Sequence, residues 1–503
     1  MWGRYPLETR HYSLGRNHPV KMDRDLDAET IRPASIDETE EKKQGEADVV
    51  TRHADIDQQV LRRVVRKIDY RLLPMLSILY LFAYMDRSAV ANASIFGYKT
   101  SLGISPTQYT LISSIFFIPY SLLEIPSNIA VTYVRPSLWI TGLCFVWGIT
   151  MTLSGLVQNF SGAIAARWFL GVTEAGFFPA AITLVGDWYP RAQLQSRISA
   201  FYVVGVFSGA FSGLLAYGIH YMDGVGGLIS WRWIFILEGL ATVALCPLLF
   251  FILPDYPSSA KWLTPVEKDT ILASRALQGT EDKTHFRKDY LIAVLKRPQT
   301  YLITWIYGSI NVILFGFSYT LPTILTQLGY TAEIAQLMTV PLYGAACILT
   351  FLTSLFADRI GRRSPVILVG LVVSLIGLVM LAALPKDRMA VARYIGCLLV
   401  LIGGYPAIPG TLAWNSNNCK NGGIRNMSVA FQLCFGNLVS IIGINAYSAS
   451  PAPEYWAGFG VAIGAAGTAI IACSILVFIL HRKNHALDQK ALEGLDDDFR
   501  YCL

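Results

Sequence analysis

The sequence predicts an all-α membrane protein with twelve transmembrane helices, arranged as two six-helix bundles. Charged residues make up only 15% of the chain and hydrophobic residues 53%, whereas a soluble protein needs about 25% charged residues to cover its surface. Two sets of long apolar runs are separated by a polar stretch, which divides the chain into halves of similar length. Lipid is therefore the expected environment for most of the protein.

Each apolar run is close to the length that a helix needs to span a bilayer, which is about 20 residues for about 30 Å of hydrocarbon. The runs begin near Leu72, Tyr109, Trp139, Ser161, Ile198 and Trp231, and then near Thr300, Ala335, Pro365, Val391, Met427 and Tyr455.

Polar segments set the expected domain boundaries. The first segment contains no apolar stretch typical of a cleavable signal peptide, and its composition is typical of disorder. We expect a disordered cytoplasmic tail at 1–68, a first bundle at 69–254, a cytoplasmic connector at 255–298, a second bundle at 299–482 and a cytoplasmic tail at 483–503.

The loop charges predict the orientation in the membrane, because Lys and Arg concentrate on the cytoplasmic side. Basic residues precede the first run, fill the connector and recur in alternate loops, for example at Arg135 and Arg362. The loop with Lys386 and Arg388, followed by Arg393, breaks this pattern. We expect both termini on the cytoplasmic side, with the plasma membrane favoured as the location.

Several protein classes are not indicated. The basic residues lie in loops rather than on one face, so no nucleic-acid partner is expected. The cysteines lie mostly within apolar runs without paired spacing, and no histidine lies deep in a run, so no metal site is predicted. A nucleophile–base pair typical of an enzyme is not recognisable in the helices.

Four ionisable residues in the first and fourth runs form the main candidate site. Asp86 and Arg87 are adjacent, and Arg167 and Glu174 lie seven positions apart on one helix face, about 10 Å apart. Such residues cost at least about 2.5–3.5 kcal/mol each in lipid, so they are expected to face a cavity or a partner. Protonation of one carboxylate would leave an arginine without its counter-ion and able to receive a substrate carboxylate. The alternative is that the four charges only hold helices together.

Other residues are weaker candidates. Glu124 and Glu238 lie in the second and sixth runs, where a structural role is favoured. Tyr307, Asn311 and Asn418 are candidates for contacting the rest of a substrate, while bland packing or an interfacial position remains the alternative for tyrosines such as Tyr307, Tyr319 and Tyr343. The glycines Gly205, Gly209 and Gly213 predict a smooth face for helix packing.

One loop and one helix contain local motifs. The loop with Asp358, Arg359, Gly361 and Arg362 resembles the cytoplasmic gating-loop signature of the major facilitator superfamily, although the first glycine of that signature is replaced. Arg167-Trp-Phe-Leu-Gly171 resembles its fourth-helix motif. The resemblance implies the major facilitator fold and transport by alternating access.

Longer motifs include Tyr84–Asn92, Glu124–Asn128 and Arg167–Pro179. They resemble stretches of the fungal anion:cation symporters, the family of allantoate permeases and high-affinity nicotinate transporters. The resemblance implies proton-coupled symport of a small organic anion, with no cofactor beyond the coupling proton, by a monomer in the lipid bilayer.

The resemblance also implies that the four charged residues form the coupling and binding site, and we expect a distinct role for each. Arg87 receives the substrate carboxylate, Asp86 and Glu174 carry the proton, and Arg167 pairs with one of these two carboxylates in the empty site. An exporter or facilitative carrier and a non-transporting nutrient sensor are the alternatives that the sequence leaves open.

Overall fold

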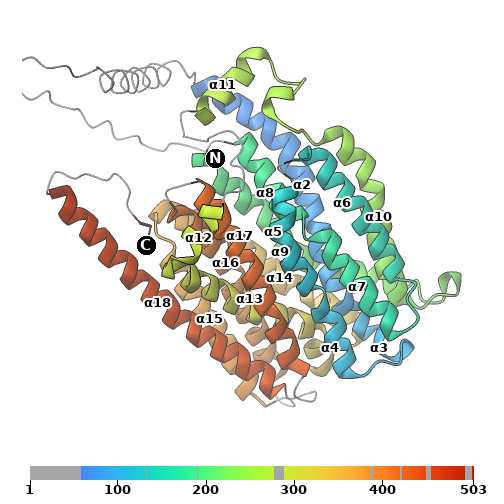
Figure 1. The fold of residues 1–503 in the computed structure, drawn as a ribbon. Helices are drawn as coiled ribbons and strands as arrows, with labels where there is room; N and C mark the ends of the chain where they lie inside the picture. The colour runs from blue at the N-terminus through green and yellow to red at the C-terminus, as the bar shows by residue number, and fades with distance from the viewer. Residues whose placement is uncertain are drawn as a thin grey trace, which may run out of the picture. The chain divides into compact units, whose positions relative to one another are not determined.

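The fold is entirely helical in the part of the chain that the structure describes. A computed structural model describes residues 58–131, 133–189, 191–276, 288–385, 389–419, 422–448, 455–492 and 501–502. Within these ranges, 12 helical spans are long and apolar enough to cross a membrane (Figure 1). This confirms the predicted all-α membrane fold with twelve spans.

The first six spans use eight main helices, because the second and fourth spans are each broken in two. The helices are α2 (Gln58–Ile95), α4 (Pro106–Ile115), α5 (Phe117–Ala130), α6 (Pro136–Ser154), α7 (Phe160–Glu174), α8 (Phe177–Trp188), α9 (Arg191–His220) and α10 (Ser230–Ile252), with the short α3 (Tyr98–Ser101) after α2. The remaining spans are single helices: α13 (Pro298–Gln327), α14 (Ala332–Ile360), α15 (Ser364–Ala383), α16 (Ala390–Asn417), α17 (Gly422–Ser448) and α18 (Trp456–Leu492).

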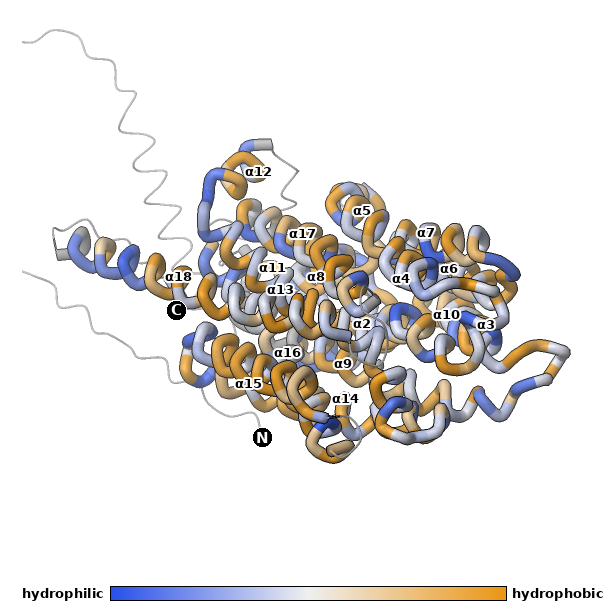
Figure 2. The backbone as a smooth tube through the Cα atoms, turned by 90° about the horizontal axis from the view of Figure 1, so that it is seen from below, coloured by the Kyte–Doolittle hydropathy of each residue, from blue (hydrophilic) through white to orange (hydrophobic). Residues whose placement is uncertain are grey.

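Hydrophobic residues predominate along the helices of the bundle, whereas hydrophilic residues gather in the last part of α18 (Figure 2). Many large apolar side chains remain exposed on the helix surfaces, among them Phe251 and Val369. In water such a surface would be strongly unfavourable, but lipid tails solvate it. The exposed apolar surface thus agrees with twelve lipid-embedded spans.

The first helix begins earlier than expected. Residues 58–68 fall within the predicted disordered tail, yet they form the first turns of α2. Leu61, Val64, Val65 and Ile68 are buried there, at the 3–4 spacing that places side chains on one helix face. This short amphipathic pattern was hidden among charged residues, and its apolar face is what makes the segment helical. The rest of the predicted tail, 1–57, lies outside the described residues.

The connector is partly helical and packs on the start of α2. Helix α11 (Pro265–Ala276) begins with a reciprocal capping box, in which Thr264 N–H donates to Glu267 over 2.9 Å and Glu267 N–H donates to the Thr264 hydroxyl over 3.3 Å. Lys67 forms an ion pair with Glu267, and Trp262 stacks on Trp188 with ring centroids 5.4 Å apart. Residues 277–287 of the connector lie outside the described residues.

Helix α9 packs against both halves of the chain through its glycines. A Cβ atom on Gly205 would overlap the ring of Tyr80 on α2, and one on Gly209 would overlap the ring of Tyr343 on α14. Glycine at these positions allows two helices to approach closely. The predicted smooth face is therefore present, and it brings α2, α9 and α14 around a central cavity.

Candidate substrate and proton site

A cavity with about 540 Å³ of empty volume lies between the two sets of six spans. Helix α2 supplies Tyr84, Arg87 and Ser88 to its wall. The other polar wall residues are Ser208 on α9, Ser318 and Tyr319 on α13, Tyr343 on α14 and Tyr405 on α16. The wall thus combines apolar and aromatic side chains with a few polar groups, which is the composition typical of small-molecule sites.

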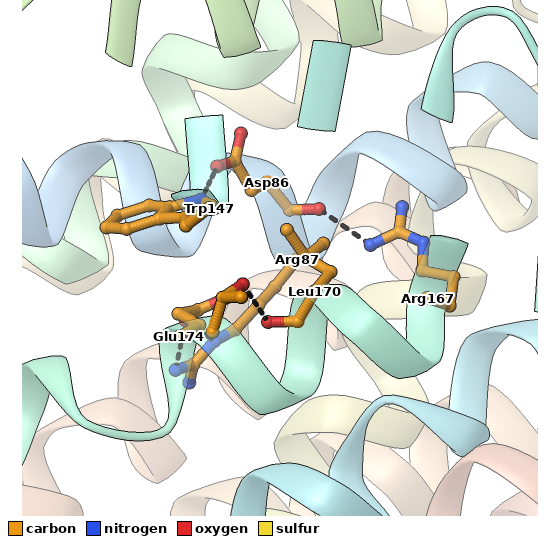
Figure 3. Close-up of polar contacts among 7 residues, drawn as sticks. Asp86, Arg87, Trp147, Arg167, Leu170 and Glu174 are labelled. Carbon is orange, nitrogen blue, oxygen red and sulfur yellow. Dashed lines mark hydrogen bonds and ion pairs between the residues drawn. The ribbon is translucent and has the colours of Figure 1, made fainter. Parts of the chain in front are cut away.

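Arg87 is the charged side chain in the wall of this cavity. Its Nε donates to Glu174 Oε1 over 2.7 Å, and one of its terminal nitrogens forms an ion pair with the same oxygen (Figure 3). The guanidinium also lies 4.5 Å from the centroid of the Tyr120 ring and 5.0 Å from that of Tyr84. These contacts hold the guanidinium at the cavity, and Glu174 Oε2 has no hydrogen-bond partner among the described residues.

Breaks in two spans place Glu174 and the aromatic residues around Arg87. Pro119 cannot donate to the carbonyl of residue 115, and the second span is interrupted there at Phe116. A Cβ on Gly171 would overlap the main-chain oxygen of Phe116, so glycine lets α7 approach this break. Helix α7 then ends at Glu174 itself, and its carboxylate reaches Arg87 on α2.

Asp86 contacts different helices from its neighbour Arg87. Its Oδ2 accepts a hydrogen bond from Trp147 Nε1 on α6, and the side chain is fully buried. Arg167 Nη1 donates to the main-chain oxygen of Asp86 over 3.0 Å, and its guanidinium lies 5.5 Å from the centroid of the Phe235 ring (Figure 3). The four predicted residues are thus brought together in two contacts, one between Arg87 and Glu174 and one between Arg167 and the main chain of Asp86.

The contacts of Arg167 agree only in part with the expectation. The sequence predicts an ion pair of Arg167 with Glu174 or Asp86, but Glu174 pairs with Arg87, and Arg167 reaches Asp86 through its carbonyl oxygen. Glu174 and Arg167 are two helical turns apart, and only Arg87 on the facing helix comes within reach of the end of α7. Spacing along one helix could not reveal which arginine on another helix would lie closer.

Tyr307 and Asn311 lie away from the cavity wall. A Cβ on Gly436 of α17 would overlap the Tyr307 ring, and Asn311 Nδ2 donates to Asn437 Oδ1 over 3.2 Å. Both residues therefore join α13 to α17 in this conformation. Tyr319 and Tyr343, for which bland packing was the alternative, do line the cavity.

Asn418 binds main chain rather than the cavity. Its Nδ2 donates to the carbonyl oxygen of Cys502 over 3.2 Å, and the N–H of Cys502 donates to Asn418 Oδ1 over 2.8 Å. Trp414 Nε1 donates to the same carbonyl over 2.8 Å. This reciprocal amide pairing holds Asn418, at the end of α16, against the main chain of Cys502.

The cavity includes polar residues that the sequence pattern did not reveal. Tyr405 and Ser318 lie within 3.4 Å of each other through their hydroxyl oxygens, and Ser88 Oγ lies 2.9 Å from Ser212 Oγ on α9. Burying an uncharged hydroxyl in the membrane costs too little free energy for such a residue to stand out within an apolar run of the sequence. Only the packing of α2, α9, α13 and α16 identifies them.

The loop motif forms a tight turn between α14 and α15. Gly361 has φ +69°, a conformation that favours glycine, and Asp358 Oδ1 lies 2.5 Å from a terminal nitrogen of Arg363. Arg359 and Arg362 are exposed. The acidic residue of the motif therefore pairs within its own loop, at the side of the bundle where the connector lies.

Side chains that commonly bind metals are scattered through the described ranges. No group of three or more His, Cys, Asp or Glu side chains there has a metal-binding arrangement, and the eight cysteines are free thiols. The site therefore consists of side-chain charges, hydroxyls and aromatic rings.

Comparison with known proteins identifies the family. Residues 76–444 match the Major Facilitator Superfamily. The chain belongs to this superfamily. Its members are transporters rather than enzymes, so this chain is a transmembrane transporter of the superfamily with a small-molecule substrate.

Relatives and solved structures agree with this placement. The chain is 34% identical over 449 residues to the MFS-type transporter cnsO of Penicillium expansum, covering 86% of this chain and 85% of that protein. It is 29% identical to the major facilitator-type transporter hxnP of Emericella nidulans, covering 90% and 91%. A D-xylose–proton symporter has the same fold at a TM-score of 0.62 and 15% identity, covering 81% of this chain and 97% of that one.

Proposed function

We propose that the protein is a proton-coupled symporter that carries a small organic anion into the cytoplasm by alternating access. The observation that carries this proposal is the position of Arg87 in the cavity wall, where its buried counter-ion is Glu174. A substrate carboxylate that enters the cavity competes with Glu174 for the same guanidinium.

Charge balance links this competition to proton binding. Glu174 is buried, and an ionised carboxylate that has lost its cation in a dry interior is costly. When a substrate carboxylate takes Arg87, Glu174 is therefore stabilised by accepting a proton. Because the coupling between two ligands is reciprocal, a proton on Glu174 also favours substrate binding.

The cavity wall supports a substrate with a compact polar or ring body in addition to its carboxylate. Four tyrosines and three serines line it together with Leu314, Phe315 and Ile408. Aromatic rings pack well against planar groups, and hydroxyls both donate and accept hydrogen bonds. Nicotinate, allantoate and related acids have this combination of features.

The orientation follows from the loop charges. With the connector on the cytoplasmic side, both termini are cytoplasmic and the central cavity serves uptake across the plasma membrane. The two sets of six spans, expected as bundles 69–254 and 299–482, would move about the cavity as in other transporters built from repeats, and the monomer contains the whole site.

The test is an uptake assay with the wild type, Arg87→Lys and Arg87→Ala. Labelled nicotinate, allantoate, pantothenate and sugar acids are presented to cells over a range of external pH, with and without a protonophore. We expect accumulation of one of these acids, stimulated at acid pH, abolished by the protonophore and reduced at least about tenfold in Arg87→Ala. Wild-type uptake by Arg87→Ala would refute the anion-receptor role.

The same assay separates the alternatives. A facilitative carrier equilibrates its substrate and is insensitive to the protonophore, and an exporter lowers the internal concentration. A nutrient sensor binds labelled acid in vesicles without accumulating it.

A further inference from the structure

Asp86 and Glu238 bring two buried carboxyl groups together between α2 and α10. Their exposed fractions are 0% and 1%, and the two side chains interact directly. Asp86 Oδ1 and both carboxyl oxygens of Glu238 are buried without a hydrogen-bond donor in the described part of the chain. Two ionised carboxylates have no hydrogen to place between them, whereas one protonated carboxyl donates to the other.

The charges around the pair define how many protons it holds. From α7 it faces Arg167 and Glu174, and from α6 it faces Trp147 and Cys144, among the residues described. Trp147 donates to Asp86 Oδ2 and is uncharged.

The buried charges around the pair are those of three carboxyl groups, counting the pair itself and Glu174, and of two arginines; a fourth buried carboxyl group, Glu124, faces Arg87 rather than the pair. Glu174 balances Arg87 in a direct ion pair. Arg167 is buried and donates to the main-chain oxygen of Asp86, so its one positive charge is left to balance the pair formed by Asp86 and Glu238. A pair with two negative charges would leave one charge uncompensated in a dry interior, which is strongly unfavourable.

We propose that Asp86 and Glu238 share one proton in the substrate-free protein, which makes Glu238 a proton-binding residue. The pair then carries a single negative charge opposite Arg167, and the shared hydrogen lies between one oxygen of Asp86 and one oxygen of Glu238. Sequence alone favoured a structural role for Glu238. The storage of this proton does not depend on transport, whereas its use in coupling rests on the proposed symport.

Such a pair responds to the arginine that faces it. Any movement of α7 that takes Arg167 away from α2 and α10 removes the compensating positive charge, and the pair then binds a second proton. A movement that brings a further positive charge nearby releases the shared proton. The number of protons bound by Asp86 and Glu238 thus depends on the position of α7, although neither side chain contacts the substrate.

Infrared spectroscopy tests the proposal without knowledge of the substrate. The full chain is purified in lipid nanodiscs, and the band of protonated carboxyl groups is compared for wild type, Glu238→Gln and Asp86→Asn at neutral pH in deuterated buffer. In either variant, the remaining carboxylate balances Arg167 and accepts hydrogen bonds from the new amide. We expect each variant to lose the band intensity of one carboxyl group relative to wild type.

A control variant and the pattern across the two variants distinguish a shared proton from one held by a single carboxyl group. Glu333→Gln removes a half-buried carboxylate that pairs with His220 and should leave the band unchanged. A full wild-type band in Glu238→Gln overturns the proposal. Loss of the band in Glu238→Gln but not in Asp86→Asn also overturns it, because the proton would then belong to Glu238 alone.

The readout also separates this inference from the proposed function. If the band behaves as expected and no acid is taken up in a proton-dependent manner, the shared proton stands and symport fails. Gel filtration before the measurement restricts the comparison to folded protein, and the two variants on different helices provide independent tests.

Discussion

The ion pair between Arg87 and Glu174 makes a quantitative prediction about stability. Two unit charges about 4 Å apart attract by about 4 kcal/mol at an effective dielectric constant of about 20, and both side chains are buried. Burying each ion costs several kcal/mol, so the pair as a whole contributes little net stability. Removal of one partner leaves the other charge buried and uncompensated, which costs about 3–5 kcal/mol.

A double-mutant cycle measures this effect. We expect Arg87→Gln and Glu174→Gln each to lower the thermal stability of the detergent-solubilised protein strongly, and the double variant to be more stable than either single variant. The assay is the fraction of monodisperse protein that remains after heating. Glu333→Gln, which breaks a half-exposed pair with His220, should change stability by less than about 1 kcal/mol. Additive losses in the double variant would refute the buried ion pair.

Two other perturbations test the packing of α7 and the connector. Gly171→Val places a side chain against the main-chain oxygen of Phe116, which should lower the free energy of unfolding by at least about 1–3 kcal/mol. The midpoint in the same heating assay should therefore fall. An unchanged midpoint would contradict the close approach of α7 to the break at Phe116. For Glu267, burial by itself raises the pKa, but hydrogen bonds from Lys67 and from Thr264 bring the pKa below its usual value. A lowered pKa stabilises the folded state above the ordinary pKa of Glu, about 4.3, and this stabilisation is lost as the pH falls through the lowered value. Docking of the connector on α2 can be measured by its susceptibility to protease cleavage between pH 7 and about 3. In the wild type, docking should weaken at acid pH by less than about 1 kcal/mol, and in Glu267→Gln this pH dependence should be lost. Equal pH profiles for the two proteins would count against the contact.

The sequence was sufficient to predict the spans because the signal is strong and local. An apolar run of about 20 residues has few alternatives to a transmembrane helix, and every expected start, from Leu72 to Tyr455, falls within or next to one of the 12 spans. The start of α2 was missed because four buried apolar residues at 61–68 are interleaved with Arg and Lys. A short amphipathic face is a weaker signal than a continuous run.

The candidate site was predictable only in part. Charges such as Arg87 stand out because an ionisable residue in lipid is costly, and the structure does bring the four predicted charges together. Their pairing depends on which helices are neighbours, so the sequence did not reveal that Arg167 would contact the main chain of Asp86 rather than a carboxylate. Hydroxyl and ring residues such as Tyr405 and Ser318 cost little in an apolar run, so nothing in the sequence marked them. The position of Asn418 against Cys502 depends on a contact between residues 84 positions apart.

The buried charges of the spanning helices are distributed unequally between the two halves of the chain. In the described residues, the first half contains Asp86, Arg87, Glu124, Arg167, Glu174 and Glu238, whereas Arg393 is the buried charge within the spans of the second half. The second half contributes only uncharged side chains to the cavity wall, including Ser318, Tyr319, Tyr343 and Tyr405. During evolution, this separation allows substitutions in the second half to change the substrate that the cavity accepts, while the buried charged residues of the first half stay the same.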